Sequence, residues 1–592
     1  MNSRVRTAGG LLLALAIIAA APQLLGKFAV VLLNDIGLAT LVVLGLVLVS
    51  GVGGAISFGQ AAFVGIAAYA TAWLTTTQAV SPWLGLAFAL LLTCSCAWLI
   101  GAMTMRLGGH YLPLSTIAWG LALPLLFGNI DALGSHSGLG NIPPIHLGAW
   151  SLDQDRSMFP LIWLLVLGGG WFAVNLLRSR SGRMMRALRG GEVLLASLGA
   201  DAYRVRLTLF VLAAAYAAVA GWLYAHAYRF VSPTPFSLHA SIEYMFMMVV
   251  GGTSQLAGAF LGSAVFMGLD DLLKDVMPRI SGRGSEISSL IFALIFLLIL
   301  QRVPRGLGRP LKRLLGQVRT QRPMPAAAEL ALPRRELPAR GSLLLSIDGV
   351  VRRFGGLTAV DRVSFDVRAG EIVGLIGPNG AGKSTLFNLI TGALPLTDGK
   401  VRFLDAPIAG LPQREIALRG IARTFQHVKL RSNMTLLENV ALGAHARSQC
   451  GLARGGLRLD RDEEARIAGE AMRQLERIGL ADRAHDLAGS LPLGTQRLLE
   501  IARALAADPV LIVLDEPAAG LRLVEKEGLI SLLDTLRAEG MTVLIVEHDM
   551  EFVMNLVDRL VVLNFGSKIC EGRPDEVRAD PQVQAAYLGS DA

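Results

Sequence analysis

The sequence predicts a two-part fold, with an N-terminal polytopic α-helical membrane domain and a C-terminal α/β domain of the P-loop class. Three observations predict it. Apolar runs recur through residues 1–301, a basic stretch rich in proline fills 302–342, and residues 343–592 contain a glycine loop that ends in Lys383-Ser384. These ranges are the predicted membrane domain, linker and nucleotide-binding domain.

The composition separates the same parts. The chain has 592 residues, of which 53% are hydrophobic and 17% charged, which excludes a disordered polymer and a single soluble domain. Residues 1–301 carry 16 basic and 11 acidic residues, 302–340 carry ten and two, and the remainder carry 29 and 33. The basic excess lies beside the membrane segments and in the linker, which indicates contact with membrane lipid and no nucleic-acid partner. The four cysteines are too few for a disulfide framework.

Eight apolar runs are long enough to be considered as membrane spans, because lipid offers no partners for backbone polar groups outside a helix. They lie near residues 10–26, 34–52, 56–77, 83–105, 111–128, 159–177, 205–228 and 286–301. A ninth stretch, 242–269, is interrupted by Gly251-Gly252-Thr253-Ser254-Gln255. The membrane domain is therefore expected to have about eight spans and one broken element.

The broken element is predicted to be a re-entrant pair. Arginine-rich segments at 178–186 and 302–322 are expected on the cytoplasmic side. The span 205–228 then leads outward and 286–301 leads back, so a single span at 242–269 would break the parity. A pair of helical arms that enters and leaves the membrane by the same face keeps the number of crossings consistent with both arginine-rich segments in the cytoplasm. The loops at 129–158 and 270–285 are then external.

Three features of the first half leave alternatives open. The first apolar segment is expected to stay as an anchor, with a cleaved signal peptide as the alternative. Glu243 is either an intramembrane functional carboxylate or part of a helix cap. Ser57, Gln60 and Thr116 either line the solute path or pack helices together.

The linker at residues 302–342 is expected to be a flexible tether between the membrane domain and the nucleotide-binding domain.

The glycine loop has the context that a phosphate-binding loop requires. A short buried-strand pattern at residues 371–376 precedes it and a helical pattern follows. Backbone N–H groups and a helix N-terminus would bind phosphates, Lys383 would add a positive charge, and the Ser384 hydroxyl would bind Mg²⁺. The predicted nucleotide-binding residues are Gly377, Pro378, Asn379, Gly380, Ala381, Gly382, Lys383, Ser384 and Thr385.

Two further strand patterns end in chemically useful side chains. Residues 510–514 lead into Asp515-Glu516, and residues 541–546 lead into Glu547-His548. Two adjacent carboxylates beside a nucleotide allow one to bind the metal and the other to activate water. We assign Asp515 to the metal and Glu516 to the base, and we expect His548 to reach the γ-phosphate.

These residues, in this order and spacing, resemble the ATP-binding-cassette (ABC) ATPases over the whole of 343–592. Four motifs narrow the resemblance to the ATPase of branched-chain amino acid importers: Phe354-Gly-Gly-Leu, Arg423-Thr-Phe-Gln426, Met434-Thr-Leu-Leu-Glu-Asn439 and Ala586-Tyr-Leu-Gly589. The first half is similar to the permease of such importers. Its matching motifs are Gly59-Gln60-Ala-Ala-Phe63, Gly138-Leu-Gly-Asn-Ile-Pro143, Gly182-Arg183 with Leu198-Gly199, and Ser241-Ile-Glu243 with Gly251-Gly252. The chain therefore resembles a natural fusion of two subunits.

The resemblance implies an ABC fold with a helical subdomain, and ATP and Mg²⁺ as cofactors. It implies that Phe354 stacks on adenine and that Gln426 contacts Mg²⁺ and senses the permease. The signature segment would contribute Leu491, Gly494, Thr495 and Gln496. Residues 183–200 would be the cytoplasmic coupling helix that docks on an ATPase, with an ordinary internal loop as the alternative.

The sequence departs from the family pattern at two places. The signature segment usually reads Leu-Ser-Gly-Gly-Gln, whereas this chain has Pro492 where the serine hydroxyl would contact the γ-phosphate. The loop after Glu516 has Arg522 and lacks the usual aspartate. Because the signature acts on the nucleotide of the opposite ATPase, both departures indicate two inequivalent ATP sites.

The expected function is ATP-driven import of branched-chain or similar hydrophobic amino acids across the bacterial inner membrane, with the ATPase in the cytoplasm. One chain would supply one permease and one ATPase. The implied partners are a second permease, a second and non-identical ATPase, and an external solute-binding protein. The alternatives are an importer for another small solute such as urea, a half-transporter acting as a homodimer, and an ATP-gated channel or sensor without turnover.

Overall fold

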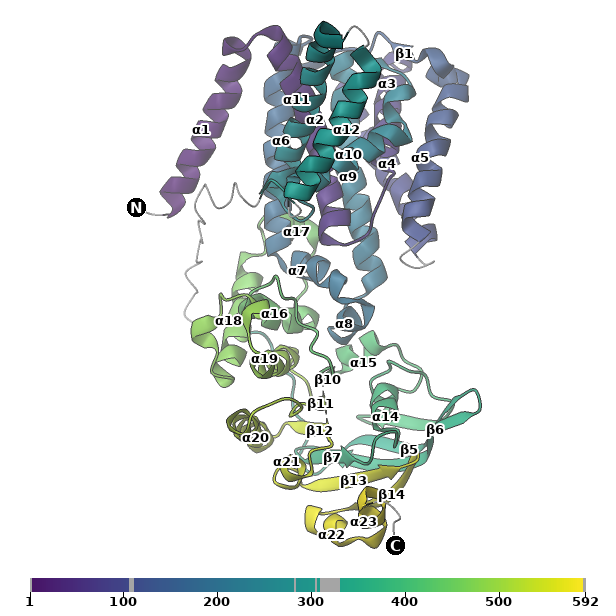
Figure 1. Cartoon of the computed structure of the whole chain (residues 1–592), viewed down its shortest axis with the longest axis vertical. Coiled ribbons are helices and arrows are strands. Elements are labelled where there is room, and N and C mark those ends of the chain that lie inside the picture. The colour runs from purple at the N-terminus through teal and green to yellow at the C-terminus, as the bar shows by residue number, and fades with distance from the viewer. Residues whose placement is uncertain (1–2, 106–110, 282–283, 304–305, 309–330, 589–592) are drawn as a thin grey trace. The chain divides into compact units, whose positions relative to one another are not determined.

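The computed structural model describes residues 3–105, 111–281, 284–303, 306–308 and 331–588, which belong to two compact units (Figure 1). Unit 1 comprises Met1–Arg178, Tyr203–Arg322 and Gly456–Arg458, and unit 2 comprises Ser179–Ala202, Pro323–Gly455 and Leu459–Ala592. The predicted coupling segment thus belongs to the same unit as the ATPase, as the resemblance implies.

Unit 1 is a bundle of long apolar helices. They are α1 (Ser3–Leu24), α2 (Lys27–Leu46), α3 (Gln60–Thr77), α4 (Pro82–Thr104), α5 (Tyr111–Asn129), α6 (Asp155–Arg178), α9 (Ala202–Tyr228), α10 (Leu238–Gly251), α11 (Leu256–Ser281) and α12 (Gly284–Arg302). Helix α2 continues as a π-helical turn, Val47–Val52. Among the described residues, six helical stretches are long and apolar enough to cross a membrane: Lys27–Val52, Pro82–Thr104, Tyr111–Asn129, Asp155–Arg178, Ala202–Tyr228 and Leu256–Val276.

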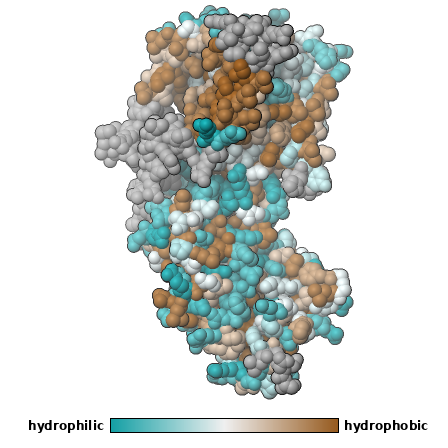
Figure 2. Space-filling view, viewed as in Figure 1, coloured by the Kyte–Doolittle hydropathy of each residue, from teal (hydrophilic) through white to brown (hydrophobic). Residues whose placement is uncertain are grey.

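On the face of unit 1 seen in Figure 2, large apolar patches are exposed, as lipid-facing helices require. Large side chains such as Leu91, Trp98, Met103 and Leu125 are more than half exposed. The interior of the unit contains close helix contacts through small residues. A Cβ on Gly221 of α9 would lie 2.2 Å from the carbonyl oxygen of Val64 on α3, so that only glycine permits this approach.

The break predicted within 242–269 is present. Helix α10 ends at Gly251, Gly252 has φ +108°, and α11 begins at Leu256. The prediction of a loop at 270–285 is wrong for residues 270–281, because α11 stays helical to Ser281. The external position of these residues stays a prediction. Lys274 and Asp270 form an ion pair of 2.6 Å one turn apart, which supports the helix there. The second arm is thus long enough to cross a membrane, which a re-entrant arm does not need, and the re-entrant topology stays a prediction.

The stretch predicted as a long loop at 129–158 contains short strands. Strand β1 (Leu139–Gly140) pairs with β4 (Phe230–Val231), and β2 (Ile145–Leu147) pairs with β3 (Trp150–Leu152). These pairs satisfy backbone groups that a bare loop would leave to solvent.

Unit 2 is an α/β domain with two sheets. One sheet has the order β10-β11-β12-β7-β13-β14, parallel except for β14, and the other is antiparallel with the order β6-β5-β8-β9. The central strands β7 (Ile372–Ile376), β11 (Leu511–Asp515) and β12 (Thr542–Val546) are buried at every position. Uninterrupted apolar runs of this kind are typical of parallel strands covered on both faces.

The remaining strands and helices of unit 2 complete the two sheets and a helical subdomain. The strands are β5 (Leu343–Phe354), β6 (Leu357–Arg368), β8 (Asp398–Phe403), β9 (Ala406–Pro407), β10 (Ile421–Arg423), β13 (Arg559–Asn564) and β14 (Ser567–Gly572). The helices are α7 (Arg180–Ala187), α8 (Glu192–Ser197), α14 (Lys383–Ile390), α15 (Gln413–Arg419), α16 (Leu436–Gly443), α17 (Leu452–Gly456), α18 (Arg461–Arg477), α19 (Leu493–Leu505), α20 (Leu523–Ala538), α21 (Met550–Met554), α22 (Pro574–Ala579) and α23 (Pro581–Leu588).

The helical subdomain that the resemblance implies is built from α16, α18 and α19. Their apolar faces share one core, which contains Leu436, Ile467, Leu475 and Leu499. Each contributing helix is amphipathic, as α18 illustrates with charged residues on its outer face. The fold class predicted from the sequence is therefore confirmed.

The end of the predicted linker is fixed to unit 2. Leu332 is buried in the core of the helical subdomain, and Arg447 donates hydrogen bonds to the carbonyls of Leu332 and Pro333. The backbone N–H of Arg335 donates to Asp508 at 2.5 Å. A flexible tether is thus the wrong description for residues 331–340, while residues 309–330 lie outside the described part of the chain.

Candidate nucleotide site

The phosphate-binding loop joins β7 to α14. Gly377 has φ +151° and Gly382 has φ +96°, and a Cβ at either position would lie within 2.3 Å of a backbone carbonyl oxygen, that of Leu563 or Ala359. Only glycine fits both the conformation and the space. The loop residues predicted from the sequence therefore form one turn at the carboxyl end of β7, where ligands of parallel sheets bind.

Lys383 points back into this loop. Its buried ammonium donates hydrogen bonds to the carbonyls of Gly377 at 2.7 Å and Pro378 at 2.9 Å. Burial lowers the pKa of Lys383, while the charges of Glu516 and Asp515 act in the opposite direction. The ammonium is thus held near both carboxylates, in the place where a terminal phosphate would compete for it.

Asp515 ends β11 beside the loop. Its backbone N–H donates to the Thr424 hydroxyl at 3.1 Å, and its buried Oδ1 atom has no hydrogen-bond partner. Burial, with the charges of Glu516 and Glu547, raises the pKa of Asp515 to about 6, although Arg423 lowers it. A buried carboxylate oxygen without a partner suits a divalent cation, because hard cations prefer oxygen ligands.

The other predicted metal ligands also carry oxygen donors. Ser384 is an exposed residue in the first turn of α14, and Gln426 is exposed in the segment after β10. With Asp515, they offer a hydroxyl, an amide and a carboxylate, which is a donor set that fits Mg²⁺. No cluster of three His, Cys, Asp or Glu residues occurs in the described ranges, so the structure presents no alternative metal centre of that type there.

Glu516 and His548 lie close together although they follow different strands. The distance between His548 Nδ1 and Glu516 Oε2 is 3.9 Å, and the imidazole is 55% exposed. Glu516 has φ +46°, and its N–H donates to the Val546 carbonyl at 2.8 Å, which holds the residue at the end of β12. Because the imidazole is exposed, a phosphate or a water can approach it from solvent beside Glu516.

Glu547 is a positioning residue that the sequence reasoning left without a role. Its carboxylate is fully buried and accepts hydrogen bonds from the N–H groups of Ala518 at 2.7 Å and His548 at 3.0 Å. It therefore fixes the loop after Glu516 to the residue that carries the imidazole. A carboxylate directly after an all-buried strand is the signal that could have indicated this role.

Arg497 is a second residue that was missed. From the first half of α19 it donates to the Glu516 carbonyl at 2.9 Å and to the Gln426 carbonyl at 3.2 Å. The guanidinium therefore ties the predicted base and the predicted sensor glutamine to the signature helix. Arginine is suited to this because its planar fork bridges two acceptors.

The signature segment begins α19. Pro492 is the N-cap residue, and no side-chain hydrogen bond caps the helix. Gln496 donates from its side chain to the Leu491 carbonyl at 2.8 Å, and the carboxylate of Glu525 lies against Gly494, where a Cβ would be 2.7 Å from Oε2. Thr495 is half-buried in the first turn. The segment thus presents backbone N–H groups and no hydroxyl at the cap.

Phe354 ends β5 and is 43% exposed. The guanidinium of Arg352 lies over one face of its ring at 4.5 Å from the centroid. The predicted adenine contact therefore has one ring face already covered by a cation.

Both halves of the chain match models of known protein families. Residues 28–300 match the family model described as branched-chain amino acid transport system / permease component, and 360–519 match the ABC transporter model. Residues 567–592 match the model described as branched-chain amino acid ATP-binding cassette transporter.

Three relatives resemble the second half. The high-affinity branched-chain amino acid transport ATP-binding protein LivG of Salmonella typhimurium is 44% identical over 249 residues, covering 42% of this chain and 98% of that protein. The corresponding protein BraF of Pseudomonas aeruginosa is 41% identical with the same coverage. A probable LivG of Methanocaldococcus jannaschii is 36% identical, covering 42% of this chain and 97% of that protein. With the P-loop site geometry and both family matches, the chain belongs to the branched-chain amino acid ABC transporter family, as an ATP-hydrolysing protein that joins a permease component and an ATP-binding component in one polypeptide.

Proposed function

We propose that this protein drives the import of branched-chain or similar hydrophobic amino acids across the bacterial inner membrane, and that each chain supplies one permease and one ATPase. The observation that carries the proposal is the presence of a permease-family region and an ABC ATPase in one polypeptide. The ATPase lies in the cytoplasm in this proposal, since the arginine-rich segments that flank the spans favour that side.

The chain's own residues supply the hydrolytic steps of this proposal. Backbone N–H groups of the loop and the Lys383 ammonium bind the phosphates, and Phe354 stacks on adenine. Glu516 accepts a proton from the attacking water, and His548 contacts the γ-phosphate. Mg²⁺, held by Ser384, Gln426 and Asp515, would supply positive charge to the phosphate oxygens when bound.

A complete importer needs further subunits in this proposal. The signature segment of one ATPase acts on the nucleotide bound by another, so a second ATPase and a second permease are required. An external solute-binding protein would deliver the amino acid. Closure of the two ATPases on ATP would then switch the permeases between their two open states.

The test is uptake by the purified assembly in proteoliposomes supplied with its solute-binding protein and internal ATP. We expect accumulation of labelled leucine, isoleucine or valine that stops when ATP is omitted. Accumulation of urea without accumulation of any hydrophobic amino acid would contradict the assigned solute. Failure to accumulate any solute despite ATP hydrolysis would contradict import itself.

A further inference from the structure

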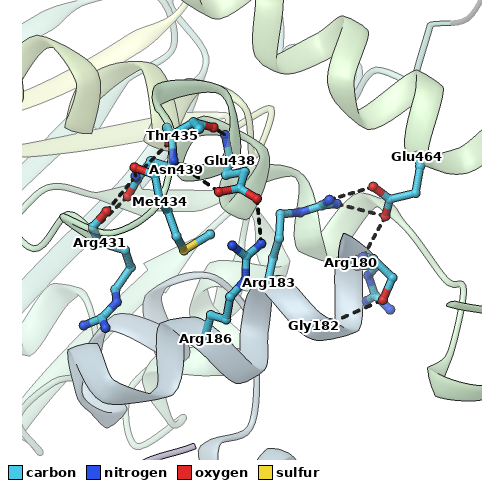
Figure 3. Close-up of polar contacts among 11 residues, drawn as sticks. Arg180, Gly182, Arg183, Arg186, Arg431, Met434, Thr435, Glu438, Asn439 and Glu464 are labelled. Carbon is cyan, nitrogen blue, oxygen red and sulfur yellow. Dashed lines mark hydrogen bonds and ion pairs between the residues drawn. The ribbon is translucent and has the colours of Figure 1, made fainter. Parts of the chain in front are cut away.

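The docking segment, defined here as residues 179–202, packs against the ATPase domain within unit 2. It contains α7 and α8, and its contacts are with α15, α16 and α18. The Gly199 carbonyl accepts a hydrogen bond from Arg414 of α15 at 3.1 Å. Three arginines of α7, Arg180, Arg183 and Arg186, make further polar contacts (Figure 3).

Arg183 and Glu464 form a buried ion pair. The two guanidinium nitrogens lie 2.6 and 3.1 Å from the two carboxylate oxygens, and the side chains are only 7% and 10% exposed. One of these oxygens also accepts the backbone N–H of Arg180 at 2.6 Å. A buried bidentate pair is geometrically specific, and leaving one member without the other is strongly unfavourable.

Arg186 and Glu438 form a second, partly exposed pair at 2.8 Å. Burial raises the pKa of Glu438, but the charge and the hydrogen bond of Arg186 outweigh it, so the pKa is below its usual value. Glu438 also accepts the N–H of Thr435 at 3.1 Å, while the Thr435 hydroxyl accepts from Glu438 N. The carboxylate that receives Arg186 therefore also caps α16.

Arg180 makes contacts of a different kind. Its guanidinium donates to the carbonyls of His445 at 2.9 and 3.1 Å and of Cys450 at 3.2 Å. Backbone carbonyls are present in any ATPase with the same turn, so Arg180 positions the segment. Arg183 and Arg186 instead contact carboxylate side chains, and a contact of this kind depends on which residue occupies the position.

We propose that Arg183 recognises Glu464 as a charge code, through which the docking segment selects the ATPase domain of its own chain over an ATPase that lacks a carboxylate at this position. Arg186 adds to the attachment but does not select, because Glu438 belongs to the motif at 434–439 on which the resemblance to the ATPases of this family rests. The selection follows from burial, because a neutral or basic residue opposite Arg183 would remove the bidentate carboxylate from a desolvated charge. The inference rests on the proposed function in one respect, which is that the assembly contains a second ATPase to reject.

The test uses the full-length chain in lipid nanodiscs and measures amide hydrogen exchange in residues 180–187. We expect Arg183→Glu and Glu464→Arg alone to speed this exchange by about tenfold or more, and the double variant to restore it. Arg183→Lys keeps the positive charge but loses the planar guanidinium that donates two hydrogen bonds, so it is expected to give an intermediate rate of amide exchange. The matched control is Arg477→Glu with Glu539→Arg, a more exposed pair in which one arginine nitrogen donates to both carboxylate oxygens. Its variants should leave the exchange unchanged.

Two outcomes would overturn the charge code: unchanged exchange in both single variants, or exchange in the double variant as fast as in the single ones.

Solute uptake is measured on the same variants to separate this inference from the proposed function. If the double variant regains the slow exchange of the wild type but neither the wild type nor any variant takes up solute, the proposed function alone is contradicted. Normal uptake with unaltered exchange in Arg183→Glu would contradict the charge code alone. Recovery when the two substitutions lie on separate co-expressed chains would contradict selection within one chain.

Discussion

At the scale of single residues, the hydrolytic role of Glu516 can be tested most directly. Glu516→Gln keeps the size and the backbone contacts of the residue but removes the proton acceptor. We expect steady ATP hydrolysis to fall by about 10²-fold or more, while ATP binding persists. Phosphate release and nucleotide binding are measured on the same preparation, and unchanged turnover would remove Glu516 from the role of base.

His445 provides a prediction on pH. Burial, together with the charges of Arg180, Arg183 and Arg414, lowers the pKa of His445 from 6.5 to about 3. Below about pH 6.5 the histidine of the unfolded chain binds a proton that the folded chain excludes, so the free energy of unfolding falls as the pH decreases toward 3. The loss at about pH 5.5 is expected to be on the order of 1 kcal/mol relative to neutral pH.

Thermal unfolding of the wild type and His445→Gln at about pH 7.5 and pH 5.5 checks this expectation. Glutamine does not titrate, so the variant should lose less stability on acidification than the wild type does. An equal loss in both proteins would show that other groups determine the acid sensitivity.

The residues that could be predicted from sequence are those in contiguous motifs. The loop from Gly377 to Thr385 and the pair Asp515-Glu516 each follow a buried strand directly, so local pattern is sufficient. Arg497 could not be found in this way, because its partners Glu516 and Gln426 belong to two other segments that meet it only in the folded domain. Arg183 and Glu464 illustrate the same limit, since 281 positions separate them.

At the scale of elements, the packing of α10 on α11 depends on glycine. A Cβ on Gly262 would lie 1.8 Å from the Met247 carbonyl oxygen and 2.9 Å from the Gly251 nitrogen. Both are backbone atoms, so Gly262→Ala must force the two helices apart. We expect it to destabilise the chain by about 1–3 kcal/mol, seen as a lower midpoint of thermal unfolding in detergent.

Gly268→Ala is the matched control for this experiment. It makes the same change in the same helix, and its Cβ would meet nothing within 4 Å. If both variants unfold at the wild-type temperature, close approach of α10 and α11 does not contribute to stability.

Hydrophobic runs predicted the helices well and their ends less well. The helix predicted from residue 56 begins only at Gln60, after a segment with glycines at 53, 54 and 59. At the end of α11 the pattern misleads in the opposite direction, because the charged residues at 270–275 predict a loop whereas they lie on an exposed helical turn. Apolar periodicity does not report on such a turn.

At the scale of the whole molecule, the variant signature segment predicts two ATP sites of unequal activity in the assembled transporter. Pro492→Ser would restore a hydroxyl at the N-cap of α19, where serine is also a favourable capping residue. We expect it to tighten ATP binding at the site completed by this signature by about tenfold, since one hydrogen bond to a charged group contributes about 1–3 kcal/mol.

ATP titration of the complete assembly measures this effect. Leu459→Ser, which adds a hydroxyl at another exposed position, serves as the control. Equal hydrolysis at both sites of the unmodified assembly would argue against the inequality, and so would an unchanged titration in Pro492→Ser.

The abrupt change of charge and hydropathy near residue 301 predicts a division into a membrane part and an ATPase part. The assignment of residues 179–202 and 331–340 to the surface of the ATPase was not predictable from composition. Both segments are basic, and their positions depend on carboxylates that occur far away in the sequence.

Glu438 has two roles, capping α16 and pairing with Arg186, and together they restrict which residues can replace it during evolution. Closing the start of α16 requires a side chain that reaches back one turn, which glutamate and glutamine can do. Receiving Arg186 requires a negative charge, which glutamine lacks and which the shorter aspartate carries at a different height. Of the twenty amino acids, only glutamate meets both requirements, so drift at residue 438 would have to be accompanied by a change at residue 186.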